Sequence, residues 1–393
     1  FVASSTSATV TASYWDTDVS NILTSVRGEG RTTSAMKSIN TFFTNGWDFD
    51  DAWGINNTVN DGYPFLTWEG YGSEGLFAGG HGTSAQPYQI IDCSQLQNMK
   101  LNMTTNYILI DDIDCSDTVN WNIGHGFERV GGYGSANHFR GVFDGQGYTI
   151  DGLFMNYTSS WYQGMFGVIE DAIIKNVKLT NANITGNGET AALVGEAINS
   201  DLINVGIEGT VNGALLTGGI IGLSTNSTIL DSYFAGDVVV EGNYAGGLVG
   251  RMRNTVINRS YSEGLVSSEN IRAGGLVGSQ EGSSKVDNSY SSATVIAINN
   301  AGGLVGEQDN SHIINSFAIG YVNSTGTNVG GLIGYNPNNE NVVSSYWDID
   351  TTDMTTSRGG EGKTTAELKA IATFESWDIA ETTSVLNDGY PFL

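Results

Sequence analysis

Basic residues are scarce in this chain of 393 residues. Only 16 Lys and Arg stand against 42 Asp and Glu, which gives a formal net charge of −26. Nucleic-acid phosphates and anionic membrane surfaces are bound mainly through Lys and Arg, so this balance argues against both as partners. No run of about 18 apolar residues is present either, and we therefore expect no membrane insertion by this chain. The charge is typical of a surface protein that repels its neighbours unless cations screen it.

Recognisable catalytic motifs are also missing. The four histidines form no HExxH pair, no GxSxG sequence surrounds a serine, and no glycine-rich phosphate loop occurs. We therefore predict that the chain is not an enzyme and needs no cofactor. Because two carboxylates suffice to hydrolyse a glycoside, a polysaccharide-degrading enzyme is kept as the weakest of three functional hypotheses.

Cysteine is rare: Cys93 and Cys115 are the only two, 22 residues apart. They are either buried free thiols or a disulfide, and we favour the disulfide because other features indicate an extracellular protein. Phe1 opens directly into repeat-like sequence without a signal peptide, as expected for a processed chain or a segment of a longer precursor. Candidate N-glycosylation sequons begin at Asn56, Asn102, Asn156, Asn183, Asn226, Asn258 and Asn323.

Glycine is abundant, with 53 residues against four prolines, and it marks a repeat. The motif GGLVG, or a variant of it, ends at successive glycines that are 28, 27, 28, 28, 28 and 28 residues apart. These glycines are Gly167, Gly195, Gly222, Gly250, Gly278, Gly306 and Gly334. Each period holds short β-branched and aromatic runs between Gly, Asn and Ser, without helical apolar spacing. The period predicts an all-β protein, a right-handed parallel β-solenoid of about 28-residue repeats.

Stacking in register predicts which residues lie above one another. We expect an interior column of Leu248, Leu276, Leu304 and Leu332 and an aromatic column of Tyr233, Tyr261, Tyr290 and Phe317. We also expect a hydrogen-bonded ladder near one turn, interrupted by Arg259. Its members are Asn176, Asn204, Asp231, Asn288 and Asn315. The glycine pairs are expected to allow positive φ or close backbone approach.

The GGLVG runs resemble GLUG repeats, which occur in bacterial and archaeal cell-surface proteins and beside some immunoglobulin A metalloproteases. The resemblance covers nearly the whole chain. Within it, Pro87–Met155 is similar to the module that precedes the coils in such proteins. The resemblance implies an extracellular, cell-surface location and a β-helix-like fold. It does not imply an activity, and without HExxH the metalloprotease activity does not carry over.

One segment occurs twice. YWDTD at Tyr14 matches YWDID at Tyr346, and both copies end in DGYPFL. We expect these small mixed modules to cover the end of a solenoid, because open strand edges invite uncontrolled pairing. The chain is thus divided into a leading module (1–70), an initiating module with the candidate disulfide (71–155), the GLUG solenoid (156–345) and a C-terminal module (346–393).

The first copy has no solenoid in front of it, although Ala8–Ser13 resembles Val342–Ser345, the strand before the second copy. Either the chain is a fragment of a tandem protein, or the leading module folds back on its own chain, or this strand pairs with another subunit. The candidate assembly residues are Ala8, Thr9, Val10, Thr11, Ala12 and Ser13.

From these features we expect a structural subunit of an extracellular assembly, a surface layer, sheath or fibre that self-assembles as a homopolymer. The alternative is a monomeric adhesin or stalk that binds glycans or host proteins. Carboxylates around Asp111–Asp117 could bind Ca²⁺, although their spacing matches no known calcium loop. The alternative is a solvated acidic surface with loosely held counterions, and the sequence identifies no metal ligands.

Overall fold

The computed structural model describes residues 9–49, 52–55, 60–66, 76–337, 341–374, 377 and 389–391. Contacts divide the chain into two compact units, Phe1–Ile91 and Asp92–Leu393. Residues 76–91, which the sequence analysis places in the initiating module, fall in the first unit. No helix in the described ranges is long and apolar enough to cross a membrane.

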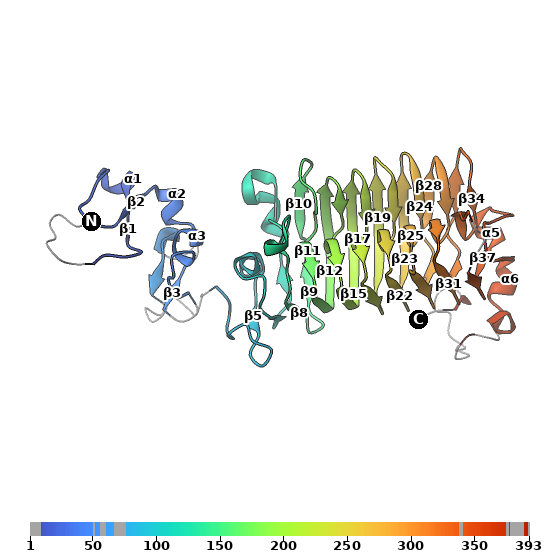
Figure 1. The fold of residues 1–393 in the computed structure, drawn as a ribbon, viewed down its shortest axis with the longest axis horizontal. Helices are drawn as coiled ribbons and strands as arrows, with labels where there is room; N and C mark the ends of the chain where they lie inside the picture. Colours follow the sequence, from blue (N-terminus) through green and yellow to red (C-terminus); the bar gives the residue numbers. More distant parts are fainter. Residues whose placement is uncertain are drawn as a thin grey trace. The chain divides into compact units, whose positions relative to one another are not determined.

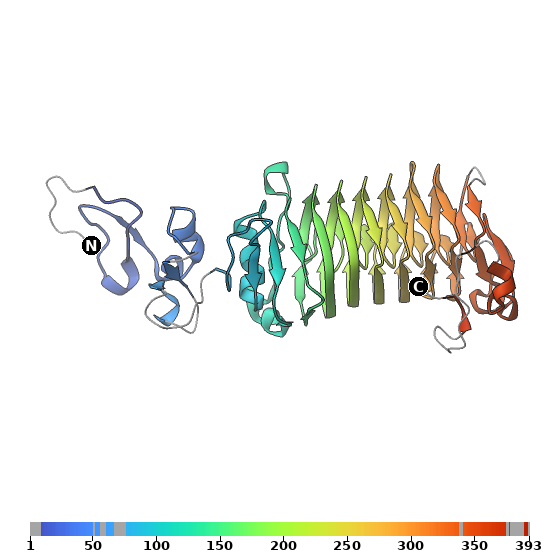
Figure 2. The same cartoon turned by 90° about the horizontal axis from the view of Figure 1, so that it is seen from below.

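The second unit is a parallel β-solenoid, which confirms the predicted fold class (Figures 1 and 2). One coil runs through β21 (Val249–Arg253), β22 (Val256–Asn258), β23 (Tyr261–Ser268) and β24 (Ile271–Gly274), and then enters the next coil at β25 (Val277–Glu281). Each strand pairs in parallel with its equivalent one coil away, as β21 does with β25 and β22 with β26 (Lys285–Asp287). The coil therefore presents three β-faces, each extended by stacking.

The three faces contain the following strands. The seven-stranded face consists of β11 (Phe166–Glu170), β14 (Val194–Ile198), β17 (Ile221–Thr225), β21, β25, β30 (Val305–Asp309) and β35 (Ile333–Tyr335). The six-stranded face consists of β13 (Glu189–Thr190), β16 (Leu216–Gly218), β20 (Tyr244–Gly246), β24, β29 (Asn299–Gly302) and β34 (Val329–Gly330). The bent third face includes β8 (Val142–Asp144), β9 (Thr149–Asp151), β10 (Phe154–Tyr157), β12 (Ile173–Gly186), β15 (Asp201–Gly213), β18 (Thr228–Leu230), β19 (Tyr233–Val240), β22, β23, β26, β27 (Tyr290–Ser291), β28 (Thr294–Ala297), β31 (His312–Ile314), β32 (Phe317–Ala318), β33 (Val322–Ser324) and β36 (Val342–Val343).

The predicted leucine column is confirmed. Leu248, Leu276, Leu304 and Leu332 are all fully buried. The backbone N–H of each of the first three donates to the carbonyl of the next leucine in the column at 2.9 Å. The same 28-residue step therefore places both the apolar side chain and its peptide group in register.

The predicted aromatic column is confirmed as well. The rings of Tyr233, Tyr261, Tyr290 and Phe317 stack with centroids 5.2, 5.0 and 5.0 Å apart and interplanar angles of 8°, 2° and 10°. This separation matches the spacing of neighbouring strands, about 4.8 Å, because each ring is carried by the equivalent strand residue of successive coils.

The asparagine ladder lies at a turn where the chain adopts positive φ. Asn204 has φ 55° and donates from Nδ2 to Oδ1 of Asn176 at 3.0 Å. The expectation that Arg259 interrupts the ladder is wrong on the side that faces Asp231. Arg259 has φ 48°, and its guanidinium donates to both carboxylate oxygens of Asp231, at 2.6 and 2.8 Å. Beyond it, Asn288 donates instead to the side chain of Asn258. The turn therefore tolerates Arg where a carboxylate in the preceding coil can pair with it.

Serines form an interior column that the sequence analysis did not identify. Ser232, Ser260, Ser289, Ser316 and Ser345 precede the aromatic position of successive coils. The backbone N–H of each donates to the hydroxyl of the next at 3.2 Å, while each hydroxyl donates to the carbonyl two residues before it in its own coil. These bonds satisfy backbone donors at a bend where the strand ladder is broken.

The glycine pairs act through close approach rather than through positive φ. At Gly275, a Cβ atom would lie 2.1 Å from the carbonyl oxygen of Gly303 and 2.1 Å from Oγ of Ser291. The Gly303 carbonyl belongs to the backbone of the next coil and cannot retreat without shifting that coil. The repeated GG sequence thus reflects the packing of backbone on backbone at this corner.

The first unit contains short elements. They are β1 (Tyr14–Asp16), α1 (Thr17–Ser20), β2 (Glu29–Arg31), α2 (Thr33–Met36), α3 (Ile39–Phe43), β3 (Trp53–Gly54), η1 (Asn60–Gly62), β4 (Phe65–Leu66) and β5 (Tyr88–Ile90). Strand β1 pairs in parallel with β2 in a two-stranded sheet, and β3 pairs with β4 in antiparallel orientation.

We predict that Asn204→Ala lowers the free energy of unfolding by about 1–3 kcal/mol, since it loses a ladder hydrogen bond and forces Ala into the left-handed region. Asn204→Gly loses only the hydrogen bond, so it should lower the free energy of unfolding by less than Asn204→Ala does. Urea unfolding followed by circular dichroism measures both. Equal losses in the two variants would show that the positive φ of this turn contributes nothing.

Candidate functional site

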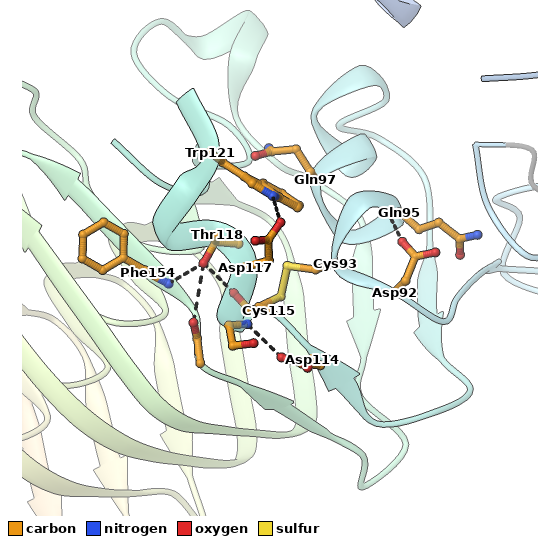
Figure 3. The surroundings of a disulfide bond; sticks show 12 residues. Asp92, Cys93, Gln95, Gln97, Asp114, Cys115, Asp117, Thr118, Trp121 and Phe154 are labelled. Carbon is orange, nitrogen blue, oxygen red and sulfur yellow. Dashed lines mark hydrogen bonds between the residues drawn. A yellow bond between two sulfur atoms is a disulfide. The ribbon is translucent and has the colours of Figure 1, made fainter. Parts of the chain in front are cut away.

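A disulfide joins Cys93 and Cys115 within the second unit, with their Cα atoms 5.2 Å apart (Figure 3). Cys93 begins α4 (Cys93–Asn98), whose first turn is capped by the Asp92 carboxylate accepting from the Gln95 N–H. Cys115 directly precedes η4 (Ser116–Gly124). Both cysteines are buried, so the bridge forms part of the packing that begins the solenoid.

The segment held by the disulfide covers the first edge of the stack. Strand β6 (Tyr107–Leu109) pairs with β8, and β7 (Ile113–Asp114) pairs with β9. The buried Thr118 ties the same segment to the next coil, because its hydroxyl donates to the carbonyl of Cys115 at 2.6 Å and accepts from the N–H of Phe154 at 3.0 Å (Figure 3). The segment thus covers β8 and β9, the strands with which the third face would otherwise begin.

We predict that Cys93→Ser, Cys115→Ser lowers the free energy of unfolding of this first edge by about 3 kcal/mol, the usual effect of opening a loop of this length. Hydrogen exchange measured by mass spectrometry should show faster exchange in β6 and β7 and little change in β30. Uniformly faster exchange along the solenoid would contradict the assignment of a local role to the bridge.

The C-terminal module covers the opposite edge. It contains β37 (Tyr346–Asp348), α5 (Ile349–Thr352), β38 (Glu361–Lys363), α6 (Thr365–Leu368) and η6 (Ile371–Phe374). Strand β37 lies between β32 of the last coil and β38 of the module. A loop of the module then provides acceptors for backbone N–H groups of the last coil. Ser357 Oγ accepts from the N–H groups of Leu332 and Ile333, and the carbonyl of Thr356 accepts from Gly331 N–H.

Aromatic contacts complete this cover. Trp377 and Tyr390 place their rings 6.2 and 6.4 Å from Phe317, the last member of the aromatic column. Phe317, Tyr290, Leu368, Phe374 and Tyr390 form one buried apolar cluster. The module thus stabilises the last coil by both strand pairing and apolar burial.

The leading module has the same internal geometry. The indole N–H of Trp15 donates to the carbonyl of Ile22 at 2.8 Å, as Trp347 does to Met354 at 2.9 Å. The hydroxyl of Tyr63 donates to the Asp16 carboxylate at 2.6 Å, and that of Tyr390 donates to Asp348 at the same distance. The two copies therefore share their fold as well as their sequence.

The candidate assembly residues precede β1 directly. Ala8 lies outside the described residues; Thr9 and Thr11 are exposed, and Val10, Ala12 and Ser13 are partly exposed. Ala12 has φ 43°, close to the 45° of Ser344 before the C-terminal module. At Ala12 the segment therefore has the same left-handed backbone as the corresponding residue at the end of the last coil.

Three of the sequon asparagines lie on one outward face. Asn156, Asn183 and Asn323 are exposed on β10, β12 and β33. Successive pairings place Asn156 and Asn323 at opposite ends of one column, whose intervening members are Thr185, Asn212, Val239, Ser267 and Ile296. Asn183 is two residues from Thr185 on the same strand and so faces the same way.

The other sequons are placed differently. The side chains of Asn226 and Asn258 take part in ladders, Asn226 with Asn199 and Asn254, and Asn258 with Asn288. Asn102 is half-buried, and its Oδ1 accepts from Thr104. Asn56 lies outside the described residues. Asn102 and Asn258 are therefore less accessible for modification than the three on the outward face, whereas Asn226 is exposed although its side chain takes part in a ladder.

The carboxylates considered for Ca²⁺ bind the protein's own donors. Asp112 accepts from the N–H of Thr149, Asp114 from that of Ser116, and Asp117 from Asn120 and Trp121. In the described ranges, no group of three or more His, Cys, Asp or Glu side chains is arranged to hold a metal ion. The histidines contact the chain singly; His138, for example, binds Glu170 at 2.9 Å.

Two glutamates that the sequence analysis overlooked lie close together in the first coils. Glu189 is only 6% exposed, and its Oε2 has no hydrogen-bond partner among the described residues. Burial, and then the charge of Glu189, raise the pKa of Glu196 to about 7; burial also raises the pKa of Glu189. Nothing in a 28-residue pattern indicates this pair, because the next coil carries Leu216 and Leu223 at the same two positions.

We predict that Glu196→Gln increases the free energy of unfolding by about 1–2 kcal/mol at pH 8 and changes it little at pH 4. This magnitude is reduced to allow for the partial exposure of the Glu196 side chain. The folded-state pKa is raised, so the wild-type glutamate is neutral and tolerated at low pH and destabilises the fold as pH rises from about 4.5 through 7. Melting temperatures at both pH values measure the effect. An equal change in melting temperature at both pH values would contradict the prediction. Glu241→Gln, at an exposed position, is the control.

Comparison with known proteins agrees with these repeats. The GLUG motif matches residues 269–296. Halomucin of Haloquadratum walsbyi is 36% identical over 162 residues, 39% of this chain and 2% of that protein. A protein of Evansella cellulosilytica described as a Gly-rich membrane protein is 39% identical over 129 residues, 32% of this chain and 14% of that protein. The chain therefore spans only a small part of the length of these relatives.

Among solved structures, a Bacteroides ovatus protein assigned as an immunoglobulin A1 protease superposes with a TM-score of 0.53. The match covers 81% of this chain and 96% of that one, at 18% identity. At this identity the likeness shows the fold alone. Together with the motif and the two relatives, it confirms the predicted resemblance: this chain is a β-solenoid that carries the GLUG motif and is similar to GLUG-repeat proteins of the cell surface.

Proposed function

We propose that this chain is a structural subunit of an extracellular assembly, a surface layer, sheath or fibre, in which β-solenoids are linked into a homopolymer. One observation carries the proposal: the module that covers the last coil occurs a second time, at Tyr14–Leu66, with the same internal hydrogen bonds. A second copy is useful where one solenoid meets another.

The charge of the chain supports a role for cations in this assembly. Subunits with a net charge of −26 repel each other, and divalent cations would reduce this repulsion. We therefore propose Ca²⁺ as a screening or bridging ion at contacts between subunits. We also propose the cell surface as the location, which fits the description of one relative as a membrane protein.

A monomeric adhesin is the second candidate. Trp161 is 50% exposed and Tyr133 is 80% exposed, and both belong to the first coils. Exposed aromatic rings of this kind bind sugar faces in many proteins, so they favour a glycan as the ligand. We propose no catalytic activity, since the likeness to an assigned protease is one of fold.

Electron microscopy of the purified chain tests the first proposal. We expect regular filaments, tubes or sheets in millimolar Ca²⁺, their loss with chelator, and their return when Ca²⁺ but not an equal ionic strength of NaCl is restored. Dispersed particles at every concentration and cation would refute the assembly role. Saturable binding of a glycan by those particles, lost in Trp161→Ala, would instead support the adhesin.

A further inference from the structure

The six-stranded and seven-stranded faces meet at a corner where their side chains contact each other. Arg251 on β21 and Arg272 on β24 both lie over the ring of Tyr244 on β20, with their guanidinium carbons 5.4 and 4.9 Å from the ring centroid. Arg272 Nε also donates to Glu307 Oε2 on β30 at 2.7 Å, and Asn300 Nδ2 donates to the same oxygen at 2.8 Å. In these later coils a guanidinium is thus held between an aromatic ring and a carboxylate.

The first coils repeat this corner with different side chains. Strand pairing places Tyr162 and Glu189 in one column of the six-stranded face, and Arg272 and Asn300 follow in the same column. Tyr162 therefore precedes Glu189 as Arg272 precedes Asn300. Tyr162 and Arg272 also share a left-handed backbone, with φ 58° and 64°. The column thus offers the same backbone position to a tyrosine in the first coils and to an arginine later.

Glu196 completes the correspondence on the seven-stranded face, because strand pairing places it in the column of Glu307. The first coils therefore carry the carboxylate of the later corner and add a second one at Glu189, but have Tyr162 where the later corner has its guanidinium. In the described part of the chain, no Lys, Arg or His forms an ion pair with either glutamate. The corner has acceptors of negative charge and no cation of its own.

The two carboxylates lie close enough to affect each other and the Tyr162 phenol. Burial, and then the charge of Glu189, raise the pKa of Glu196, and burial followed by the charges of both glutamates raises the pKa of Tyr162. Glu189 is more than nine-tenths buried, and its Oε2 has no hydrogen-bond partner among the described residues. A buried carboxylate oxygen without a donor is unfavourable, and a cation bound at this corner would relieve both the missing bond and the repulsion.

The surrounding residues favour an organic cation over a metal ion. Trp161 is half exposed and packs on Gly188, where an added Cβ atom would lie 2.8 Å from the indole. An accessible aromatic ring therefore lies next to Glu189. Ca²⁺ takes about six to eight oxygen ligands, whereas the described residues form no group of three or more His, Cys, Asp or Glu side chains that could hold a metal. A guanidinium needs only a carboxylate and a ring face.

We propose that Glu189, Glu196 and the ring of Trp161 form a binding site for a guanidinium group, carried by an arginine side chain of a partner protein. The guanidinium donates to the partly exposed carboxylate of Glu196 and lies against the indole, while the buried Glu189 attracts it from below. The net charge of −26 favours the approach of a basic partner. This site goes beyond the proposed assembly role and does not depend on it.

Isothermal titration of the full chain at low ionic strength tests the site with the peptide acetyl-Gly-Arg-Gly-amide, whose only charge is its guanidinium. The matched peptide carries citrulline, which has nearly the same shape and no charge. We expect saturable 1:1 binding of the arginine peptide and at least tenfold weaker binding of the citrulline peptide. Equal binding of the two peptides, or no saturable binding of either, would overturn the inference.

Glu196→Gln should weaken binding of the arginine peptide at least tenfold. This variant is expected to fold, because it removes repulsion from Glu189. Glu241→Gln changes the net charge by the same amount at an exposed position and should leave the dissociation constant unchanged within about twofold. Equal weakening in the two variants would show that net charge alone attracts the peptide and would refute the site.

A variant that fills the site from within gives an independent check. Tyr162→Arg places a guanidinium at the position that Arg272 occupies in the later corner, with a backbone conformation that an arginine already adopts there. It should weaken peptide binding at least tenfold, and Tyr162→Phe should not. Unchanged binding in Tyr162→Arg would contradict the inference. Ca²⁺ binding that is lost in Glu196→Gln, without binding of the arginine peptide, would identify the corner as a metal site instead.

Discussion

The stacking of parallel coils is the constraint on which the rest of the structure depends. In such a stack, the backbone groups of one coil are satisfied by the coils before and after it rather than by its own turn, as the leucine column illustrates. Interior coils therefore stabilise one another, and any coil at an end is left with a row of unpaired groups. The disulfide-bridged segment and the C-terminal module meet this requirement at the two edges with different elements.

The periodic part of this structure could be predicted from the sequence because one register fixes many contacts at once. The glycine spacing alone places Leu276 under Leu304 and Tyr261 under Tyr290. The serine column was equally visible, since a serine precedes each aromatic residue, but its meaning depends on a bend that breaks the strand ladder. Arg259 was misinterpreted because an Arg at positive φ is unusual, and only the carboxylate of Asp231 explains it.

Departures from the repeat could not be predicted in the same way. Glu189 and Glu196 affect each other only because two strands bring them together in coils where their successors are leucines. The accessibility of the sequons also depends on the fold, since Asn258 is partly buried and belongs to a ladder, whereas Asn183 faces outward. In contrast, the duplicated module was evident from its sequence, and its matching geometry extends to single hydrogen bonds.

The few basic residues form ion pairs mainly between coils, and these pairs affect the charge of the solenoid surface. Lys175 pairs with Asp144, Lys178 with Glu208, and Arg251 with Glu281, and each pair is about one coil apart in sequence. An exposed pair such as Lys178–Glu208 adds little stability by itself, but all three pairs neutralise carboxylates along the stack. Because acidic residues far outnumber basic ones, the chain keeps most of its negative charge even when every basic residue is paired.

The serine column gives the solenoid a direction. From Ser232 to Ser345, each serine N–H in the column donates toward the C-terminal end, and the hydroxyl of the following serine accepts from the N-terminal side. The two ends of the column are therefore chemically unlike: one ends in a hydroxyl acceptor and the other in an amide donor. Two solenoids can continue each other's column only when they point the same way, so any fibre built on this column would be polar, with two ends that grow at different rates.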